Sequence, residues 1–158
     1  MAHDLFQDTM VYVGRVPWHG LGRKIHPKAS FAGFLQAGNL NGGGVKLLPA
    51  QGAKQDEKGG WNRLTVMREP VGTENAPVAL GMVTSRYEIL RNVEAFAFFD
   101  PLIDRGWASY EAAGALGDGQ TVWAQVRLKD DMKVCAGDSI ERYLLLRNHH
   151  NGEGAVSI

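Results

Sequence analysis

The sequence lacks several features that mark whole classes of protein, and cysteine is the first of them. Its 158 residues include one cysteine, Cys135, so no disulfide can form within the chain. A lone thiol with no metal-ligand spacing around it is more often a packing residue than a nucleophile. Nowhere do about 18 apolar residues follow one another, and residues 1–7 contain no signal-peptide core. These absences predict a cytoplasmic protein that contacts no membrane.

Acidic residues are missing from one long stretch of a chain whose formal net charge is zero. Residues 9–55 contain no Asp or Glu but six Lys or Arg residues, which are Arg15, Arg23, Lys24, Lys28, Lys46 and Lys54. The chain has 17 basic and 17 acidic residues, so the remainder holds 11 basic and 17 acidic residues and stands at −6. Such separation of charge favours a surface that attracts anions.

Catalytic motifs are also missing. The glycines between 114 and 119 lack the Lys and Ser or Thr of a phosphate-binding P-loop, and no serine has a nucleophile-elbow context. His149 and His150 are adjacent, so on an extended segment they point to opposite faces and only one of them can join a given metal site. We expect no catalytic residue, metal or cofactor, and a metal-dependent nuclease is the least favoured function.

Glycine, by contrast, is abundant, and its 20 residues mark turns between β-like segments. Gly117-Asp118-Gly119 is typical of a tight hairpin, and the polar loop 51–60 favours a longer one. Strands are predicted where β-branched, aromatic and leucine residues gather, at 45–48, 64–68, 78–84, 109–116, 121–129 and 140–148.

Two helices interrupt this pattern. Ser30 can cap a short helix through Gln36, and Asn92 can cap the main helix, whose apolar residues fall on one face. Pro101 either kinks the main helix or restarts it with Asp100 as the cap. We therefore expect a single α+β domain over residues 1–158, with a curved antiparallel sheet of hairpins packed on one main helix and a short N-terminal helix.

Alternation in the two late strands places aromatic and basic side chains on one face. Trp123, Arg127 and Lys129 point away from Val122, Ala124, Val126 and Leu128, and Tyr143 and Arg147 repeat the arrangement. Aromatic rings that stack bases beside cations that contact phosphates are what single-stranded nucleic acid requires. The alternative is that Trp123 and Tyr143 pack under the helix or at a subunit interface.

A second candidate is the loop Pro17-Trp18-His19-Gly20-Leu21-Gly22, which is followed by Arg23 and Lys24. Its glycines let backbone amides face an anion, and Trp18 can cover a base or phosphate. The alternative is that Trp18 closes one end of the core. Arg86 and Tyr87, before the main helix, are further candidates because binding residues gather in loops beside rigid elements; an ion pair of Arg86 with Glu88 or Asp104 is the alternative.

Three motifs carry a resemblance to a known family. They are the loop 17–22, the run 81–87 that leads into Asn92-Val93-Glu94-Ala95-Phe96, and Arg142-Tyr143-Leu144-Leu145-Leu146 with the residues to Gly152. In order and spacing they resemble the phage/plasmid-like family built around domain of unknown function 932. The resemblance implies a mobile element in a bacterial host, and a chain that is the N-terminal part or a short version of the family architecture. It departs at Gly42-Gly43-Gly44, where tryptophan is common, and at Asn151-Gly152-Glu153, where Asp-Gly-Ser is common.

A more distant pattern is a strand, a helix, Gly106-Trp107 and then a hairpin that ends in residues 122–129. It is similar to the DNA-binding core of single-strand annealing recombinases, which implies an oligomer that holds single-stranded DNA without hydrolysing it. Together these features predict a nucleic-acid-binding homo-oligomer, because a neutral monomer has little excess charge for binding. A module that binds a host protein is the alternative. The candidate contact residues are Trp18, His19, Arg23, Lys24, Arg86, Tyr87, Trp123, Arg127, Lys129, Tyr143 and Arg147.

Overall fold

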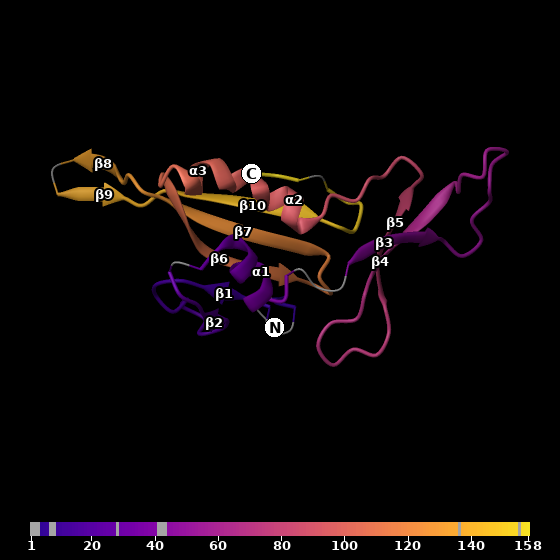
Figure 1. Ribbon diagram of the computed structural model, residues 1–158, viewed down its shortest axis with the longest axis horizontal. Coiled ribbons are helices and arrows are strands. Elements are labelled where there is room, and N and C mark those ends of the chain that lie inside the picture. The colour runs from indigo at the N-terminus through magenta and orange to yellow at the C-terminus, as the bar shows by residue number, and fades with distance from the viewer. Residues whose placement is uncertain (1–3, 7–8, 28, 41–43, 136, 155) are drawn as a thin grey trace.

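The computed structural model describes residues 4–6, 9–27, 29–40, 44–135, 137–154 and 156–158. Over these residues the chain is an α+β protein, as its sequence predicts, and its shape is elongated (Figure 1). Lys28 of the basic stretch, and Gly42 and Gly43, lie outside the described residues. Within the described ranges, no helix has the length and apolar character that a membrane crossing requires.

The larger sheet has five strands in the order β10-β7-β6-β1-β2. Neighbouring strands are antiparallel except β1 and β2, which are parallel. The predicted tight hairpin joins β6 to β7, and its Gly117 and Gly119 have φ values of +60° and +85° that glycine adopts without strain. The five strands are β1 (Val11–Tyr12), β2 (Arg23–Lys24), β6 (Ala108–Leu116), β7 (Thr121–Leu128) and β10 (Tyr143–His149).

The short N-terminal helix is present as α1 (Phe31–Ala37). Ser30 caps it as predicted, because the Ser30 Oγ accepts a hydrogen bond from the Gly33 N–H at 3.2 Å. The helix stops at Gly38, whose N–H donates to the carbonyls of Gln36 and Phe34.

The predicted main helix is divided into α2 (Asn92–Phe96), the 3₁₀ segment η1 (Ala97–Phe99) and α3 (Asp100–Asp104). Pro101 explains the division, because a proline fits the first turn of a new helix but not a helix interior. The prediction of Asn92 as the cap was wrong. Arg91 is the N-cap residue, and the Asn92 side chain donates instead to the Leu40 carbonyl at 3.0 Å.

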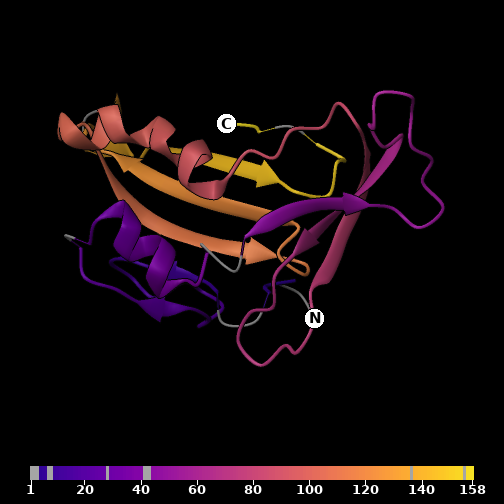
Figure 2. The same ribbon diagram turned by 45° about the vertical axis from the view of Figure 1, so that its right-hand side comes forward.

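The helices cover one side of the five-stranded sheet (Figure 2). Phe34 of α1 and Phe99 of η1 are fully buried against the sheet, and their rings contact the Tyr110 ring of β6. Val126 of β7 and Leu146 of β10 complete this core. Burial of these side chains, at about 1.5–3 kcal/mol each, holds the helices on the sheet.

The remaining predicted strands form a separate antiparallel sheet in the order β3-β4-β5. It consists of β3 (Val45–Pro49), β4 (Arg63–Arg68) and β5 (Val78–Thr84), and the predicted long hairpin joins β3 to β4. Val66, Leu80 and Val83 form its own small core. The expectation of one curved sheet was therefore wrong, because these strands pair with one another and bury their own apolar face.

A further hairpin of β8 (Met132–Cys135) and β9 (Asp138–Ile140) projects from the opposite end of the molecule (Figure 1). The predicted last strand began at Ile140, whereas Ile140 belongs to β9 and β10 begins at Tyr143. Glu141 and Arg142 separate the two strands, and neither is a turn residue such as Gly, Asn or Pro, so the sequence gives no turn signal at this junction.

Arg68 joins the two sheets. Its Nε donates to the Asp118 carbonyl in the β6–β7 turn at 2.7 Å, and its Nη1 and Nη2 donate to the Glu74 carboxylate at 2.7 and 2.8 Å. Its guanidinium lies over the Phe6 ring, 4.5 Å from the ring centre. Because Arg68 is 4% exposed, each of these contacts is made with little competition from water.

The second connection between the two sheets is close packing at two glycines, where there is no room for a side chain. A Cβ at Gly81 of β5 would collide with the backbone of Asn151, and one at Gly152 would collide with the Val83 side chain. The Gln120 Nε2 also donates to the Leu80 carbonyl at 3.3 Å. The ends of β7 and β10 therefore rest directly on the smaller sheet.

Glu74→Gln should destabilise the protein by about 3 kcal/mol at pH 7, because it leaves a buried guanidinium without its counter-charge. The hydrogen bonds from Arg68 lower the pKa of Glu74 from 4.5 to about 2. The folded pKa lies below the unfolded one, so this stabilisation is present above about pH 4.5 and is lost as the pH falls towards 2. Urea unfolding at both pH values measures the difference.

The matched control is Glu69→Gln, since Glu69 pairs with Lys46 at the exposed surface. It should change stability by less than about 1 kcal/mol. Equal losses for the two variants, or a loss for Glu74→Gln that persists at pH 2, would contradict the assigned role of the pair.

Candidate nucleic-acid interface

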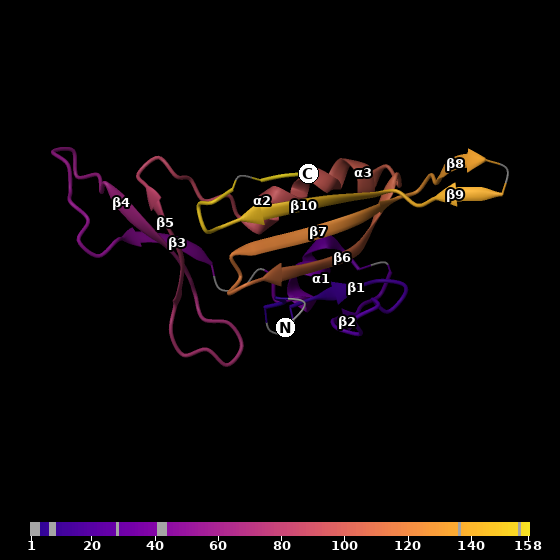
Figure 3. The ribbon, with the colours of Figure 1, turned by 180° about the vertical axis from the view of Figure 1, so that it is seen from behind.

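One side of the five-stranded sheet is covered by no helix of the described residues and faces the viewer in Figure 3. Strand alternation sends Val122, Ala124 and Val126 into the core and their neighbours to this other side. We call this side the open face and define it by its side chains from β7 and β10, which are Trp123, Gln125, Arg127, Tyr143, Leu145, Arg147 and His149.

Trp123 and Arg147 lie directly opposite each other on β7 and β10. The Trp123 indole covers Gly114 of β6, where even a Cβ would come within 3.0 Å of the ring. The absence of a side chain at Gly114 therefore lets the indole lie flat on the sheet, half-exposed. Arg147 is exposed and forms no ion pair with a carboxylate of the described residues.

A shallow hollow of about 420 Å³ surrounds this pair. Trp123, Gln125, Leu145 and Arg147 line it together with His19 of the 17–22 loop, Leu5, Met10 and Leu116. The structure thus brings together two parts of the sequence that were predicted to bind separately. The hollow offers an aromatic surface, an amide and a cation to a ligand.

The 17–22 loop does not place Trp18 in the core. Trp18 is 87% exposed, and its ring meets the His19 ring edge-on with centres 5.4 Å apart. The Leu21 N–H donates to the His19 Nδ1 at 3.0 Å, and Gly20 and Gly22 have φ values of +70° and +97°. The alternative of Trp18 as a plug of the core is therefore wrong, and the loop presents the indole to solvent.

The two cations after the loop separate onto different sides of the sheet. Lys24 pairs with Tyr12, which pairs with Ala112, which pairs with the open-face residue Gln125. Paired residues point to the same side, so Lys24 shares the open face while Arg23, beside the buried Val11, is on the helix side. With strands about 4.8 Å apart, Lys24 lies roughly 14 Å from β7.

Carboxylates surround Arg127 at the other end of the open face. Its Nη2 lies 3.2 Å from the Asp131 Oδ1 and 3.0 Å from the Glu141 Oε1. The Tyr143 hydroxyl donates to the Glu141 Oε2 at 2.6 Å, and this bond is the main cause that raises the pKa of Tyr143 to about 12. Asp131 and Glu141 therefore offset the Arg127 charge, and Tyr143 is already engaged.

The other predicted residues are dispersed. Lys129 is exposed beyond the end of β7, beside a hollow of about 340 Å³ that Arg127 and Ser109 also line. The Tyr87 hydroxyl donates to the His149 carbonyl at 3.3 Å, and burial raises the pKa of Tyr87, so this residue links β5 to the end of β10. Arg86 is exposed next to it.

The adjacent histidines point to opposite sides of the strand, as alternation predicts. His149 is on the open face, with its Nδ1 3.0 Å from the Thr121 Oγ1. His150 is buried, with its Nε2 2.9 Å from the Asn92 Oδ1, and burial lowers its pKa to about 4. The Asn148 side chain donates to Asn92 as well, which fixes the start of α2 on β10.

This buried network was not predicted from sequence. The only signal is the polar pair Asn148 and His150 at alternate positions on the helix side of a strand, opposite a polar residue at the start of a helix. Among the residues that the structure describes, no three His, Cys, Asp or Glu side chains gather in a way that would hold a metal ion.

A family model matches residues 79–158, half of the chain, whereas no curated protein and no solved structure matches. The matched half contains β5 except its first residue, Val78, the divided helix and strands β6 to β10, and with them Trp123 and Arg147. It begins well after the 17–22 loop, so the expected correspondence from Pro17 onwards, as the N-terminal part of the architecture, is not shown. Over the matched half, the chain belongs to the family described as Domain of unknown function (DUF932).

Proposed function

We propose that this chain is a nucleic-acid-binding protein of a phage or plasmid, which holds single-stranded DNA on its open face in the bacterial cytoplasm. The observation that supports the proposal best is the Trp123–Arg147 pair in a hollow that His19, the ring neighbour of the exposed Trp18, also lines. A base can stack on a half-exposed indole while the guanidinium opposite it contacts a phosphate.

Charge favours one end of the open face for the strand. Arg147 carries positive charge there and Lys24 lies in the middle row of the face, that of Gln125, while Asp131 and Glu141 make the Arg127 end unfavourable for a polyanion. The contact set that we propose is therefore smaller than the sequence suggests, and consists of Trp18, His19, Lys24, Trp123 and Arg147. Arg127 and Tyr143 lie at the other end of the open face and are not part of this contact set.

Few cations per copy imply weak binding by a monomer. We propose that several copies act together, so that each contributes a small number of contacts to one strand and the effective concentration at neighbouring sites is high. Two strands held on such an array would be displayed for annealing, as the resemblance to single-strand annealing recombinases suggests.

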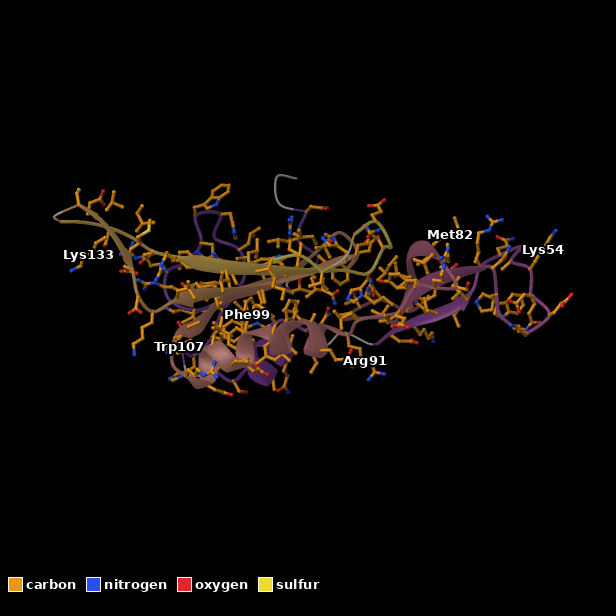
Figure 4. All side chains as sticks on the ribbon, turned by 90° about the horizontal axis from the view of Figure 1, so that it is seen from above. Lys54, Met82, Arg91, Phe99, Trp107 and Lys133 are labelled. Carbon is orange, nitrogen blue, oxygen red and sulfur yellow. The ribbon has the colours of Figure 1, made fainter. Side chains whose placement is uncertain are left out.

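Arg147→Glu should weaken binding to a labelled oligo-dT at least about tenfold, which corresponds to about 1.4 kcal/mol of binding free energy. The substitution removes a charge-assisted contact with a phosphate and puts a repelling carboxylate in its place. Fluorescence anisotropy at low salt measures the affinity. Arg91→Glu is the control, because it makes the same change of charge on the side of the helices (Figure 4). Equal affinities of the Arg147→Glu and Arg91→Glu variants for oligo-dT would show that the strand does not bind at Arg147.

Trp123→Ala should weaken oligo-dT binding by about 5- to 150-fold, which corresponds to the roughly 1–3 kcal/mol of one stacked base. Trp123→Phe retains an aromatic surface over Gly114 and should recover most of the affinity. Thermal unfolding of both variants separates a binding defect from a folding defect. If the Trp123→Ala and Trp123→Phe variants bind oligo-dT equally well, the proposed stacking of a base on Trp123 is refuted.

Salt dependence distinguishes the proposed partner from a host protein. The logarithm of the oligo-dT affinity should fall with the logarithm of salt concentration, with a slope of about −0.7 for each phosphate neutralised. A flat response would favour a protein partner held by apolar contacts. Cleavage of the oligonucleotide with Mg²⁺ or Mn²⁺, above a control with EDTA, would favour the nuclease alternative instead.

A further inference from the structure

Gln125 lies on the open face between Trp123 and Arg127 and is not part of the proposed contact set. Its side chain is half-buried and lines the hollow of about 420 Å³ together with Trp123. Its cross-strand neighbours are Ala112 of β6 and Leu145 of β10, neither of which has a polar side chain. No described residue forms a hydrogen bond with its carboxamide. A hydrogen-bond donor and an acceptor are therefore available inside the hollow.

The other neighbour of Trp123 on the same side of β7 is already engaged. Thr121 lies two residues before Trp123, and its Oγ1 is 3.0 Å from the His149 Nδ1. Gln125 lies two residues after Trp123, at a spacing of about 7 Å along the strand. The edge of a base that stacks on the indole can therefore meet the Gln125 carboxamide.

The hollow offers few other polar groups to a base. Half of the eight described residues that line it are apolar, namely Leu5, Met10, Leu116 and Leu145. The His19 Nδ1 accepts a hydrogen bond from the Leu21 N–H, and Arg147 is the proposed phosphate contact. A polar group of the base that Gln125 does not satisfy would thus face apolar side chains, which weakens binding.

One carboxamide matches the polar edge of adenine. Its N–H donates to a ring nitrogen of adenine while its carbonyl accepts from the N6 amino group, and Gln pairs with adenine in this bidentate way. The Watson–Crick edge of adenine carries only the N6 amino group and N1, whereas thymine and cytosine add the O2 carbonyl and guanine adds the N2 amino group. Gln125 can therefore satisfy the edge of adenine completely, but it leaves a polar group of each other base unpaired.

We propose that Gln125 determines specificity by hydrogen-bonding the edge of a base that stacks on Trp123, so that the hollow prefers adenine in single-stranded DNA. This inference rests on the proposed function and deepens it, because it names the base that the open face selects. Lys24 and Arg147 contribute affinity for any sequence, since the phosphates carry no sequence information.

Two alternating oligonucleotides of equal length, d(AC) and d(TC), test the preference. Neither is self-complementary, and they differ only in adenine or thymine at every second position. Wild-type protein should bind d(AC) about 5- to 150-fold more tightly than d(TC), which is the range for one bidentate pair with a base. Fluorescence anisotropy at low salt measures both affinities. If neither oligonucleotide is bound, the proposed function itself fails. If both are bound with affinities within about twofold of each other, the adenine preference alone is overturned.

Gln125→Met removes the carboxamide but retains a side chain of similar length. It should bring the affinities for d(AC) and d(TC) to within about twofold of each other, because no group is left to read the base. Gln36→Met is the matched control, since Gln36 is exposed on α1, on the helix side of the sheet, and this variant should keep the wild-type ratio. A wild-type ratio in Gln125→Met, or an equal loss of the ratio in Gln36→Met, would contradict the role assigned to Gln125.

A modified base tests the same contact from the side of the ligand. Purine in place of adenine in d(AC) lacks the N6 amino group but retains the ring that stacks. Wild-type protein should bind the modified oligonucleotide at least about fivefold more weakly than d(AC), whereas Gln125→Met should bind the two within about twofold of each other. An equal loss of affinity in both proteins would show that another group recognises the amino group, and no loss in the wild-type protein would show that none does. Either result would overturn the proposal.

Discussion

The buried Arg68 guanidinium is the contact on which the relation between the two sheets depends. It has little contact with water, so its charge must be satisfied by the Glu74 carboxylate, while its Nε and Nη1 also donate to the Asp118 and Glu69 carbonyls. Asp118 belongs to the turn that joins β6 to β7, and β7 carries Trp123. The same side chain that fixes the smaller sheet therefore also fixes one end of the proposed binding surface.

Within the five-stranded sheet, the alternation of β7 and β10 does two tasks at once. Val126 and Leu146 bury the helices on one side, which leaves the intervening residues on a side that no helix covers. Their charge is uneven along the strands, since Asp131 and Glu141 gather around Arg127 but not around Arg147. This gradient, more than the total charge of the chain, selects where an anion would bind.

Sequence patterns predicted features that depend on neighbouring residues. The Ser30 cap, the Gly117-Asp118-Gly119 turn and the limits of β5 follow from local chemistry, and the structure has them. Features that depend on distant partners were missed. The carboxylates around Arg127, the division of the strands into two sheets and the contacts of Asn92 with His150 require knowledge of which segments meet. The parallel pair β1–β2 is too short to show alternation at all.

A neutral protein with one favourable surface gains little from binding a polyanion alone, because each copy neutralises few phosphates. Repetition changes this balance, provided that the repeated surfaces face the same way. In a symmetric oligomer every copy has the same relation to its neighbours, so all open faces are presented equivalently. The strands β7 and β10 run along the long axis that separates the β8–β9 hairpin from the smaller sheet (Figure 1). Assembly along it would extend the Trp123 and Arg147 positions into a line, which is the arrangement that an extended single strand requires.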